Sequence, residues 1–148
     1  MKEISVIPFD VSMLDECIHL YQKVFAKAPW FENNDRMSIE QLFMNFHKNN
    51  AFIGYVARSG EDIVAVSIGL AKPYIKGLEY YIDQFFVDYE LQGKGIGSLF
   101  LNEIKKDLIM KNIRAIMLLT EKQYPAFNFY IKNGFSNFED MRFLGIGF

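Results

Sequence analysis

The spacing of apolar residues along the chain predicts a succession of short strands and amphipathic helices. Strands are expected where apolar residues alternate or run together, and helices where they recur every three or four residues. The expected strands cover 4–9, 51–58, 63–70, 78–87 and 115–119, with two more between Phe135 and the end. The expected helices follow Ser12 and Ser38, begin at Ile96, and cover about 125–133. The predicted order is β-α-α-β-β-β-α-β-α-β-β.

Polar residues indicate where the first two helices begin. Ser12 lies three residues before Asp15, and Ser38 lies three residues before Gln41. Serine followed at this spacing by an acid or glutamine is typical of a helix N-cap. We therefore expect Ser12 and Ser38 to cap these helices, and Pro29 to stop the first one.

The order of the elements predicts a mixed sheet flanked by helices. The unit from Leu78 to Leu119 is a strand, a helix and a strand, and such a crossover makes its two strands parallel. The hairpin before it is antiparallel. A length of 148 residues fits one domain, 1–148, with one core. Within 78–87, strict alternation would place the odd residues on one face and the even residues on the other.

Composition and charge exclude several classes of protein. One cysteine excludes an internal disulfide framework and a Cys-based zinc site, and two histidines exclude a His-rich metal site. A net charge of −2 argues against binding nucleic acid through a basic face. The sequence has no apolar run of the roughly 18–20 residues that a membrane helix needs, and its start lacks a signal-peptide pattern. We expect a cytoplasmic protein with no membrane or nucleic-acid partner and no bound metal.

Glycines alternate at 93, 95 and 97, between a predicted strand and a predicted helix. Backbone N–H groups that no Cβ shields, together with the helix N-terminus, favour an anion there. The segment departs from a Walker A loop at Asp88 and from a dinucleotide fingerprint at Ser98. It fits a third phosphate pattern, [Q/R]-x-x-G-x-[G/A], through Gln92, Gly95 and Gly97. The alternative is a turn that only starts a helix.

Three separated segments together resemble the GNAT superfamily of acyl-CoA-dependent N-acyltransferases. Residues 83–88 (DQFFVD) resemble the fourth strand of that family, and 91–99 (LQGKGIGSL) resemble its pyrophosphate loop and the following helix. Residues 126–135 (AFNFYIKNGF) resemble its closing A-x-x-x-Y-x-x-x-G-F segment. The resemblance spans 78–135, and the order of the upstream elements also fits.

The resemblance implies a fold, a cofactor and a set of contacts. It implies an α/β (α+β) fold with a mixed, mostly antiparallel sheet whose parallel fourth and fifth strands splay apart. It also implies acetyl-CoA, with pantetheine in the splay and pyrophosphate on the loop amides. Gln123 stands where the family often has Asn. The implied cofactor-binding residues are Phe85, Phe86, Val87, Gln92, Gly93, Lys94, Gly95, Ile96, Gly97, Ser98, Gln123 and Asn128.

Two side chains are the candidates for catalysis. Transfer of an acetyl group to an amine requires a base that removes a proton from the amine and a donor for the departing thiolate. We favour Asp83 as the base, directly or through water, against a solvated carboxylate that only attracts a cationic amine. Tyr130 matches the tyrosine that the family places near the sulfur. The alternative for Tyr130 is a core residue between Phe127 and Phe129.

The acceptor side is expected around the segment after the first helix. A Pro-Trp pair there resembles a subset of small-molecule and aminoglycoside-type N-acetyltransferases, and Trp30 with Glu32 would suit a cation. The alternative for Trp30 is packing between the first two helices. The candidate substrate-binding residues are Trp30, Phe31, Glu32, Tyr74 and Tyr81, with Tyr80 as a further wall.

The sequence thus predicts an acetyl-CoA-dependent N-acetyltransferase that acts on a primary amine, by direct attack in a ternary complex. A small-molecule amine is the expected acceptor. Two alternatives stay open: a protein N-terminal or lysyl acetyltransferase, and a non-catalytic acyl-CoA-binding sensor. A short C-terminal strand such as Met141 to Phe148 would pair across a homodimer.

Overall fold

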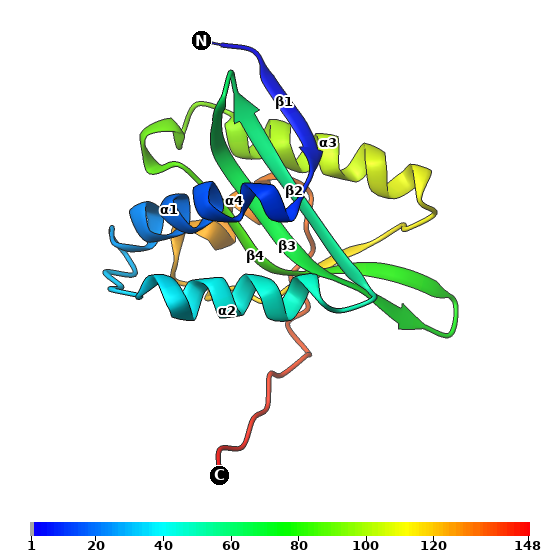
Figure 1. The fold of residues 1–148 in the computed structure, drawn as a ribbon. Helices are drawn as coiled ribbons and strands as arrows, with labels where there is room; N and C mark the ends of the chain where they lie inside the picture. The colour runs from blue at the N-terminus through cyan, green and yellow to red at the C-terminus, as the bar shows by residue number, and fades with distance from the viewer. Residues whose placement is uncertain (1) are drawn as a thin grey trace.

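A five-stranded sheet forms the centre of the computed structural model, which describes residues 2–148 (Figure 1). Its strands lie in chain order, and only β4 and β5 are parallel, as the sequence predicts. The strands are β1 (Ile4–Pro8), β2 (Phe52–Ser59), β3 (Asp62–Tyr74), β4 (Gly77–Val87) and β5 (Ile116–Leu118). β3 extends beyond its predicted end at Leu70, because its pairing with β4 continues through Pro73 to Tyr74.

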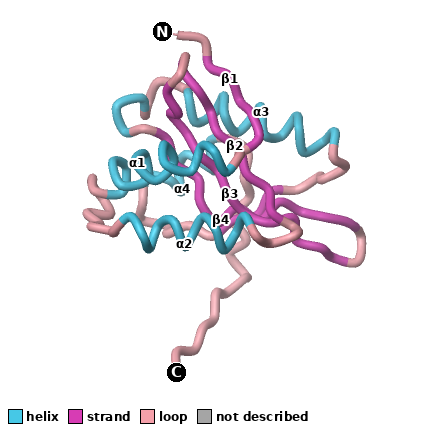
Figure 2. Tube along the Cα trace, viewed as in Figure 1, coloured by secondary structure: helices cyan, strands magenta, loops and turns pink. Residues whose placement is uncertain are grey.

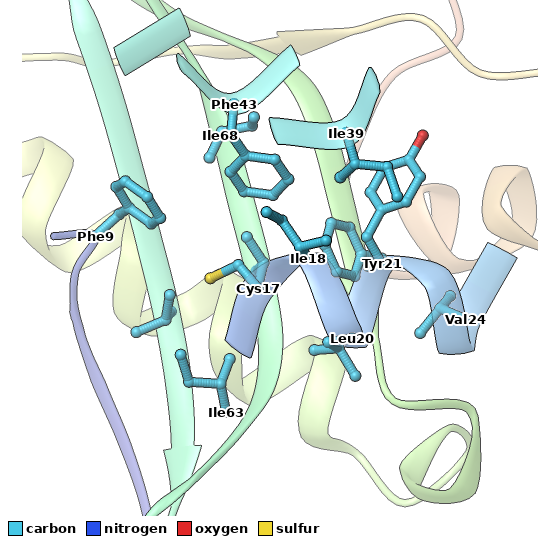
Figure 3. Close-up of a cluster of buried hydrophobic side chains, with 13 residues drawn as sticks. Phe9, Cys17, Ile18, Leu20, Tyr21, Val24, Ile39, Phe43, Ile63 and Ile68 are labelled. Atoms are coloured by element: carbon cyan, nitrogen blue, oxygen red, sulfur yellow. The ribbon is translucent and has the colours of Figure 1, made fainter. Parts of the chain in front are cut away.

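Helices cover both faces of the sheet (Figures 1 and 2). One buried cluster joins α1 and α2 to the sheet, and includes Cys17, Phe43 and Phe86 (Figure 3). A second cluster joins α3 to the other face through Phe100 and Ile104. The helices are α1 (Leu14–Phe25), α2 (Arg36–His47), α3 (Ile96–Met110) and α4 (Pro125–Lys132), with 3-10 turns η1 (Val11–Met13) and η2 (Tyr89–Leu91). No helix within residues 2–148 is long and apolar enough to cross a bilayer.

The first two helices begin with aspartates, not with the predicted serines. The Asp35 carboxylate accepts a hydrogen bond from the backbone N–H of Ser38 at 2.9 Å, and α2 begins at Arg36. Asp10 accepts from Ser12 N–H in the same way, so that η1 precedes α1. The prediction that Ser12 and Ser38 are caps was wrong because a carboxylate lies two or three residues upstream of each serine, where it reaches the free N–H first.

A β-bulge at Asp83 changes which residues of β4 share a face. Ile68 is opposite Gln84 and Gly69 is opposite Ile82, so Asp83 has no partner on β3. Before the bulge, Ile82 packs on the α3 side; after it, Phe85 and Val87 pack there, and Phe86 packs towards α1. The predicted strict alternation along β4 was therefore wrong, since one inserted residue reverses the order of the two faces.

Pairing between β4 and β5 stops one residue before the bulge. Their register joins Tyr80 to Ile116, Tyr81 to Met117 and Ile82 to Leu118. β4 continues to Val87, and within residues 2–148 no strand pairs with its far edge beyond Ile82. This leaves the backbone groups of 83–87 on that edge free of sheet partners, which is the splay that the family resemblance implies.

The chain after α4 departs from prediction. The two short strands expected between Phe135 and the end are absent, because no strand pairing involves residues 133–148 in the single chain. Instead, the end of this segment extends away from the sheet, and the C-terminus lies beyond the other elements (Figures 1 and 2).

Candidate functional site

Aromatic rings join the free end of β4 to α4. The ring of Phe85 lies 5.8 Å from that of Phe129 and 6.1 Å from that of Tyr130, centroid to centroid. Phe135 closes the other side of Tyr130 at 5.1 Å. The A-x-x-x-Y-x-x-x-G-F segment thus packs beside the splay.

The glycine segment between η2 and α3 provides backbone donors that no side chain caps. Gly93 and Gly95 have φ angles of 74° and 83°, and a Cβ on either would meet nothing within 4 Å. Gly95 is the N-cap of α3 and supplies no side-chain bond; the helical ladder starts with Leu99 N–H donating to its carbonyl at 3.0 Å. The N–H groups of 96–98 are therefore available to an anion, on the positive end of a helix.

This loop is held against β4, α4 and α1. Gln92 donates its side-chain amide to the Val87 carbonyl at 3.0 Å. A Cβ on Gly97 would lie 3.0 Å from the ring of Phe129, so a larger residue would push that ring or the start of α3 aside by a few tenths of an ångström. Lys23 of α1 forms ion pairs with Asp88, the N-cap of η2, at 2.8 Å and with Glu90, within η2, at 3.0 Å.

Tyr130 is buried with its phenol protonated. Its side chain is 8% exposed, and burial alone raises its pKa above the ordinary value. No hydrogen bond within residues 2–148 contributes to that shift. A phenol in this state holds its proton at neutral pH and has it free to donate.

Asp83, on the bulge, is exposed, and its carboxylate accepts a hydrogen bond from the Gln84 side chain at 3.1 Å. The nearby Tyr21 of α1 was not predicted as a site residue. Burial and the negative charges of Glu32 and Asp83 raise the pKa of Tyr21 to about 12. Its hydroxyl lies at the edge of the α1–α2 cluster, beside Ile39 (Figure 3). The carboxylates of Glu32, in the α1–α2 loop, and of Asp83, in β4, therefore both raise the pKa of the Tyr21 phenol.

Trp30 has a packing contact on each side. Its ring lies edge-on to Phe25 at 5.0 Å and to Tyr124, the residue before α4, at 6.2 Å. It thereby joins the end of α1 to the start of α4. Phe31 follows with φ 49°, in the left-handed region, and its side chain is 74% exposed. A bulky residue held in that conformation is uncommon and clusters at functional sites.

The remaining candidates lie further from these contacts. Tyr74 pairs with Gly77 at the tip of the β3–β4 hairpin, at the opposite end of β4 from Phe85. The Tyr81 ring lies under Lys72, whose ammonium is 5.8 Å from its centroid. Lys94, Gln123 and Asn128 are exposed. Tyr80 is fully buried and is not a wall of an open pocket; its hydroxyl bonds Ser67 at 2.8 Å.

Gly69 is a further residue that the prediction missed. A Cβ on it would lie 2.0 Å from the carbonyl oxygen of Tyr81, so the bulge at Asp83 requires glycine opposite. The signal in the sequence is an isolated glycine in a strand that is otherwise mostly apolar, which indicates a bulge or a close backbone approach.

Comparison with known proteins agrees with this geometry. A model of the acetyltransferase (GNAT) family matches residues 14–135, which is most of the chain. The chain belongs to the GNAT family of acetyltransferases. A search of curated proteins gave no match.

Solved structures of GNAT proteins and others share the fold at low sequence identity. A transcriptional regulator from Bacillus halodurans C-125 is 22% identical, with a TM-score of 0.76 over 99% of this chain and 100% of that one. An aminoglycoside acetyltransferase from an uncultured soil metagenomic sample, in complex with sisomicin, is 17% identical, with a TM-score of 0.76 over 98% and 96%. AAC(6')-Iy, in complex with a bisubstrate analog of CoA, is 10% identical, with a TM-score of 0.73 over 99% of each chain.

Proposed function

We propose that this chain is an acetyl-CoA-dependent N-acetyltransferase that acetylates a primary amine of a small molecule within a ternary complex. The observation that carries the proposal is the position of Tyr130. Its buried phenol packs against Phe85, in the part of β4 beyond Ile82 that lacks a partner strand on one edge within residues 2–148. A proton donor and free backbone groups thus lie on one wall of the splay.

The chain's residues fit acetyl-CoA at two places. The uncapped N–H groups of 96–98, with Gly93 and Gly95 leaving the approach open, would hold the pyrophosphate. The unpaired edge of 85–87 would take the peptide-like pantetheine arm as a sheet edge takes a strand. When bound, acetyl-CoA supplies an acetyl group activated as a thioester.

Tyr130 and the β4 backbone supply the donors that the reaction requires. Because burial raises the pKa of Tyr130, its phenol stays protonated at neutral pH and can donate a hydrogen bond to the departing thiolate. Transfer of that proton to the sulfur requires the bound thiolate to become basic enough to accept it. A free N–H on the 85–87 edge can stabilise the negative charge that develops on the acetyl oxygen.

Asp83 acts on the amine. The bulge leaves its carboxylate exposed beside the end of the β4–β5 pairing, where it accepts the amine's proton directly or through a water molecule. Glu32 adds a second negative charge near Tyr21, which favours an acceptor that arrives as a cation. The exposed ring of Phe31, beside Trp30, suits a small organic acceptor better than a flat protein surface.

A thiol-release assay with a panel of amines tests the proposal. The panel holds polyamines, aminoglycosides, and peptides with a free N-terminus or lysine. We expect turnover with small cationic amines, and a loss of about 10²–10⁴-fold in kcat for Tyr130→Phe, as for other general acids. Phe127→Leu, on the same helix, serves as the control for packing. Tight CoA binding without turnover of any amine would indicate the sensor, and turnover of peptides alone would indicate a protein acetyltransferase.

The pH profile separates the two roles of Asp83. If Asp83 is the base, Asp83→Asn removes the acidic limb of the kcat/KM profile. If its charge only attracts the amine, the limb stays and only KM rises. Asp62→Asn, an exposed aspartate at the β2–β3 turn, is the matched control and should leave the profile unchanged.

A further inference from the structure

Lys23 of α1 is the counter-ion of two carboxylates that come just before the glycine segment. Its ammonium lies 2.8 Å from the carboxylate of Asp88 and 3.0 Å from that of Glu90. Within residues 2–148, no other cation pairs with either carboxylate. One lysine, which lies 65 and 67 residues earlier in the chain, therefore offsets two neighbouring negative charges.

The Asp88 carboxylate is fixed from two directions. Its side chain is only 14% exposed. One oxygen accepts the Glu90 N–H at 3.1 Å, as the N-cap of η2, and the other accepts from Lys23. The backbone N–H of Asp88 is held as well, since it donates to the Val64 carbonyl of β3 at 2.8 Å. A carboxylate held in this way cannot turn out to water when its counter-ion is removed, so its charge is then left uncompensated.

The ring between these two carboxylates also faces α1. The ammonium groups of Lys23 and Lys27 lie 5.2 Å and 5.1 Å from the centroid of the Tyr89 ring. Both distances suit a cation–π contact. Lys27 reaches the ring but, within the described residues, forms no ion pair with Asp88 or Glu90. It therefore does not replace Lys23 as their counter-ion.

These negative charges stand close to the place proposed for an anion. Only residues 92–95 separate η2 from α3, whose free N–H groups at 96–98 would receive the pyrophosphate. Residues 92–95 span at most about 14 Å when extended. This length is comparable to the Debye length of about 10 Å at 0.1 M salt, so charges on η2 act on an anion at the start of α3. Two uncompensated carboxylates on η2 would therefore oppose the binding of pyrophosphate.

We propose that Lys23 is a positioning residue for the cofactor, whose charge neutralises the carboxylates of Asp88 and Glu90 so that the glycine segment can receive the pyrophosphate of acetyl-CoA. This inference rests on the proposed function, and it adds a residue of α1 to those predicted to serve the cofactor. The alternative is a mechanical role, in which Lys23 only holds α1 against η2. The two roles differ in one respect: removal of the two negative charges compensates for the loss of Lys23 only if its charge is what matters.

Isothermal titration calorimetry with CoA tests the role of the charge. We expect Lys23→Met to bind CoA about 5–20-fold more weakly, as is typical of groups coupled in one ion-pair network, and Lys23→Arg to bind like the wild type because it keeps the charge. Adding Asp88→Asn and Glu90→Gln to Lys23→Met removes both negative charges, and asparagine is as good an N-cap as aspartate. This triple variant should regain the affinity of the wild type.

A second lysine provides the matched control. Lys106 pairs at 2.6 Å with Glu103 on its own helix, α3. Lys106→Met loses the same charge and should bind CoA like the wild type. Circular dichroism checks that each variant is folded. In steady-state assays, Lys23→Met should raise KM for acetyl-CoA and leave kcat unchanged.

The salt dependence of binding gives an independent readout. Because salt screens the repulsion, the difference in CoA affinity between Lys23→Met and the wild type should shrink as NaCl is raised from about 20 to 500 mM. A difference that does not change with salt, or a triple variant that binds as weakly as Lys23→Met, would assign Lys23 the mechanical role and overturn the proposal. If Lys23→Met binds CoA as tightly as the wild type, this proposal fails and the proposed function stands. If the wild type binds no CoA, both fail.

Discussion

Gly69 has the least room for a side chain among the described glycines. A Cβ on it would lie 2.0 Å from the Tyr81 carbonyl oxygen and 3.0 Å from the Cα of Ile82, and both obstacles are backbone. Since Cβ contacts under 3.0 Å essentially never occur, Gly69→Ala has to separate β3 from β4 by about 1 Å at the bulge. Rotation of a side chain cannot relieve this contact.

The size of the effect follows from two opposing contributions. Overpacking of a well-packed site costs about 1–3 kcal/mol. Replacing glycine by alanine stabilises the folded state by roughly 0.4–1 kcal/mol, because it lowers the conformational entropy of the unfolded chain. We expect Gly69→Ala to lower the free energy of unfolding by about 1–2 kcal/mol, and the Tm by roughly 3–8 °C. Because the displacement begins where β5 leaves β4, we also expect kcat of the proposed reaction to fall.

Urea and thermal unfolding of both the wild type and Gly69→Ala measure this change. Gly54→Ala, on the neighbouring strand β2, is the control, because a Cβ there meets the ring tip of Phe52 at 2.5 Å and that ring can turn. We expect the control to lose less stability and to keep its kinetic constants. If Gly69→Ala unfolds like the wild type, the bulge does not depend on a glycine opposite, and the reasoning fails.

Three further predictions follow from single contacts. Gly95→Ala should raise KM for acetyl-CoA, because a Cβ would enter the open approach to the loop amides; Gly134→Ala, with a positive φ of 90° and equally open surroundings, should not change KM in steady-state assays. Ser67→Ala should lower the free energy of unfolding by about 1–3 kcal/mol, because it leaves the buried Tyr80 hydroxyl without its 2.8 Å partner. In urea titrations, the double variant Ser67→Ala/Tyr80→Phe should recover part of that loss. Tyr21, with its pKa raised to about 12 in the folded chain against about 10 unfolded, favours folding below pH 10 and loses that contribution as the pH rises to 12. Unfolding titrations from pH 9 to 12 should therefore show stability falling with pH, and Tyr21→Phe should reduce that slope by about 1.4 kcal/mol per pH unit; an unchanged slope would contradict the shift.

Much of this fold is predictable because its signals are local. The apolar stripe of α3 and the glycines before it predict a helix and an open N-terminus within one stretch of sequence. The crossover from β4 to β5 follows from the order strand, helix, strand, and the parallel pairing agrees. The place of Tyr130 beside the splay came from a motif and not from periodicity, which alone would favour a core residue.

The errors arise where two distant segments decide the outcome. The bulge at Asp83 depends on Gly69 across the sheet, and no pattern within β4 shows it. The helix caps were predicted wrongly because both serine and aspartate side chains can accept a hydrogen bond from the free N–H groups at a helix start. Only the folded geometry shows which side chain accepts it. The apolar C-terminal segment has strand-like composition, but a strand also needs a partner, and within residues 2–148 this segment pairs with none.

The bulge also limits how the length of β4 can change in evolution. A residue gained or lost on the hairpin side of Asp83 can be absorbed at the exposed Tyr74–Gly77 turn, because that end of the strand leads only into a loop. The same change between Asp83 and Val87 would reverse the faces of Phe85 and Phe86, and would shift the glycine segment that follows. We therefore expect relatives to vary in length before Asp83, and to keep a fixed number of residues from Asp83 to Gly97.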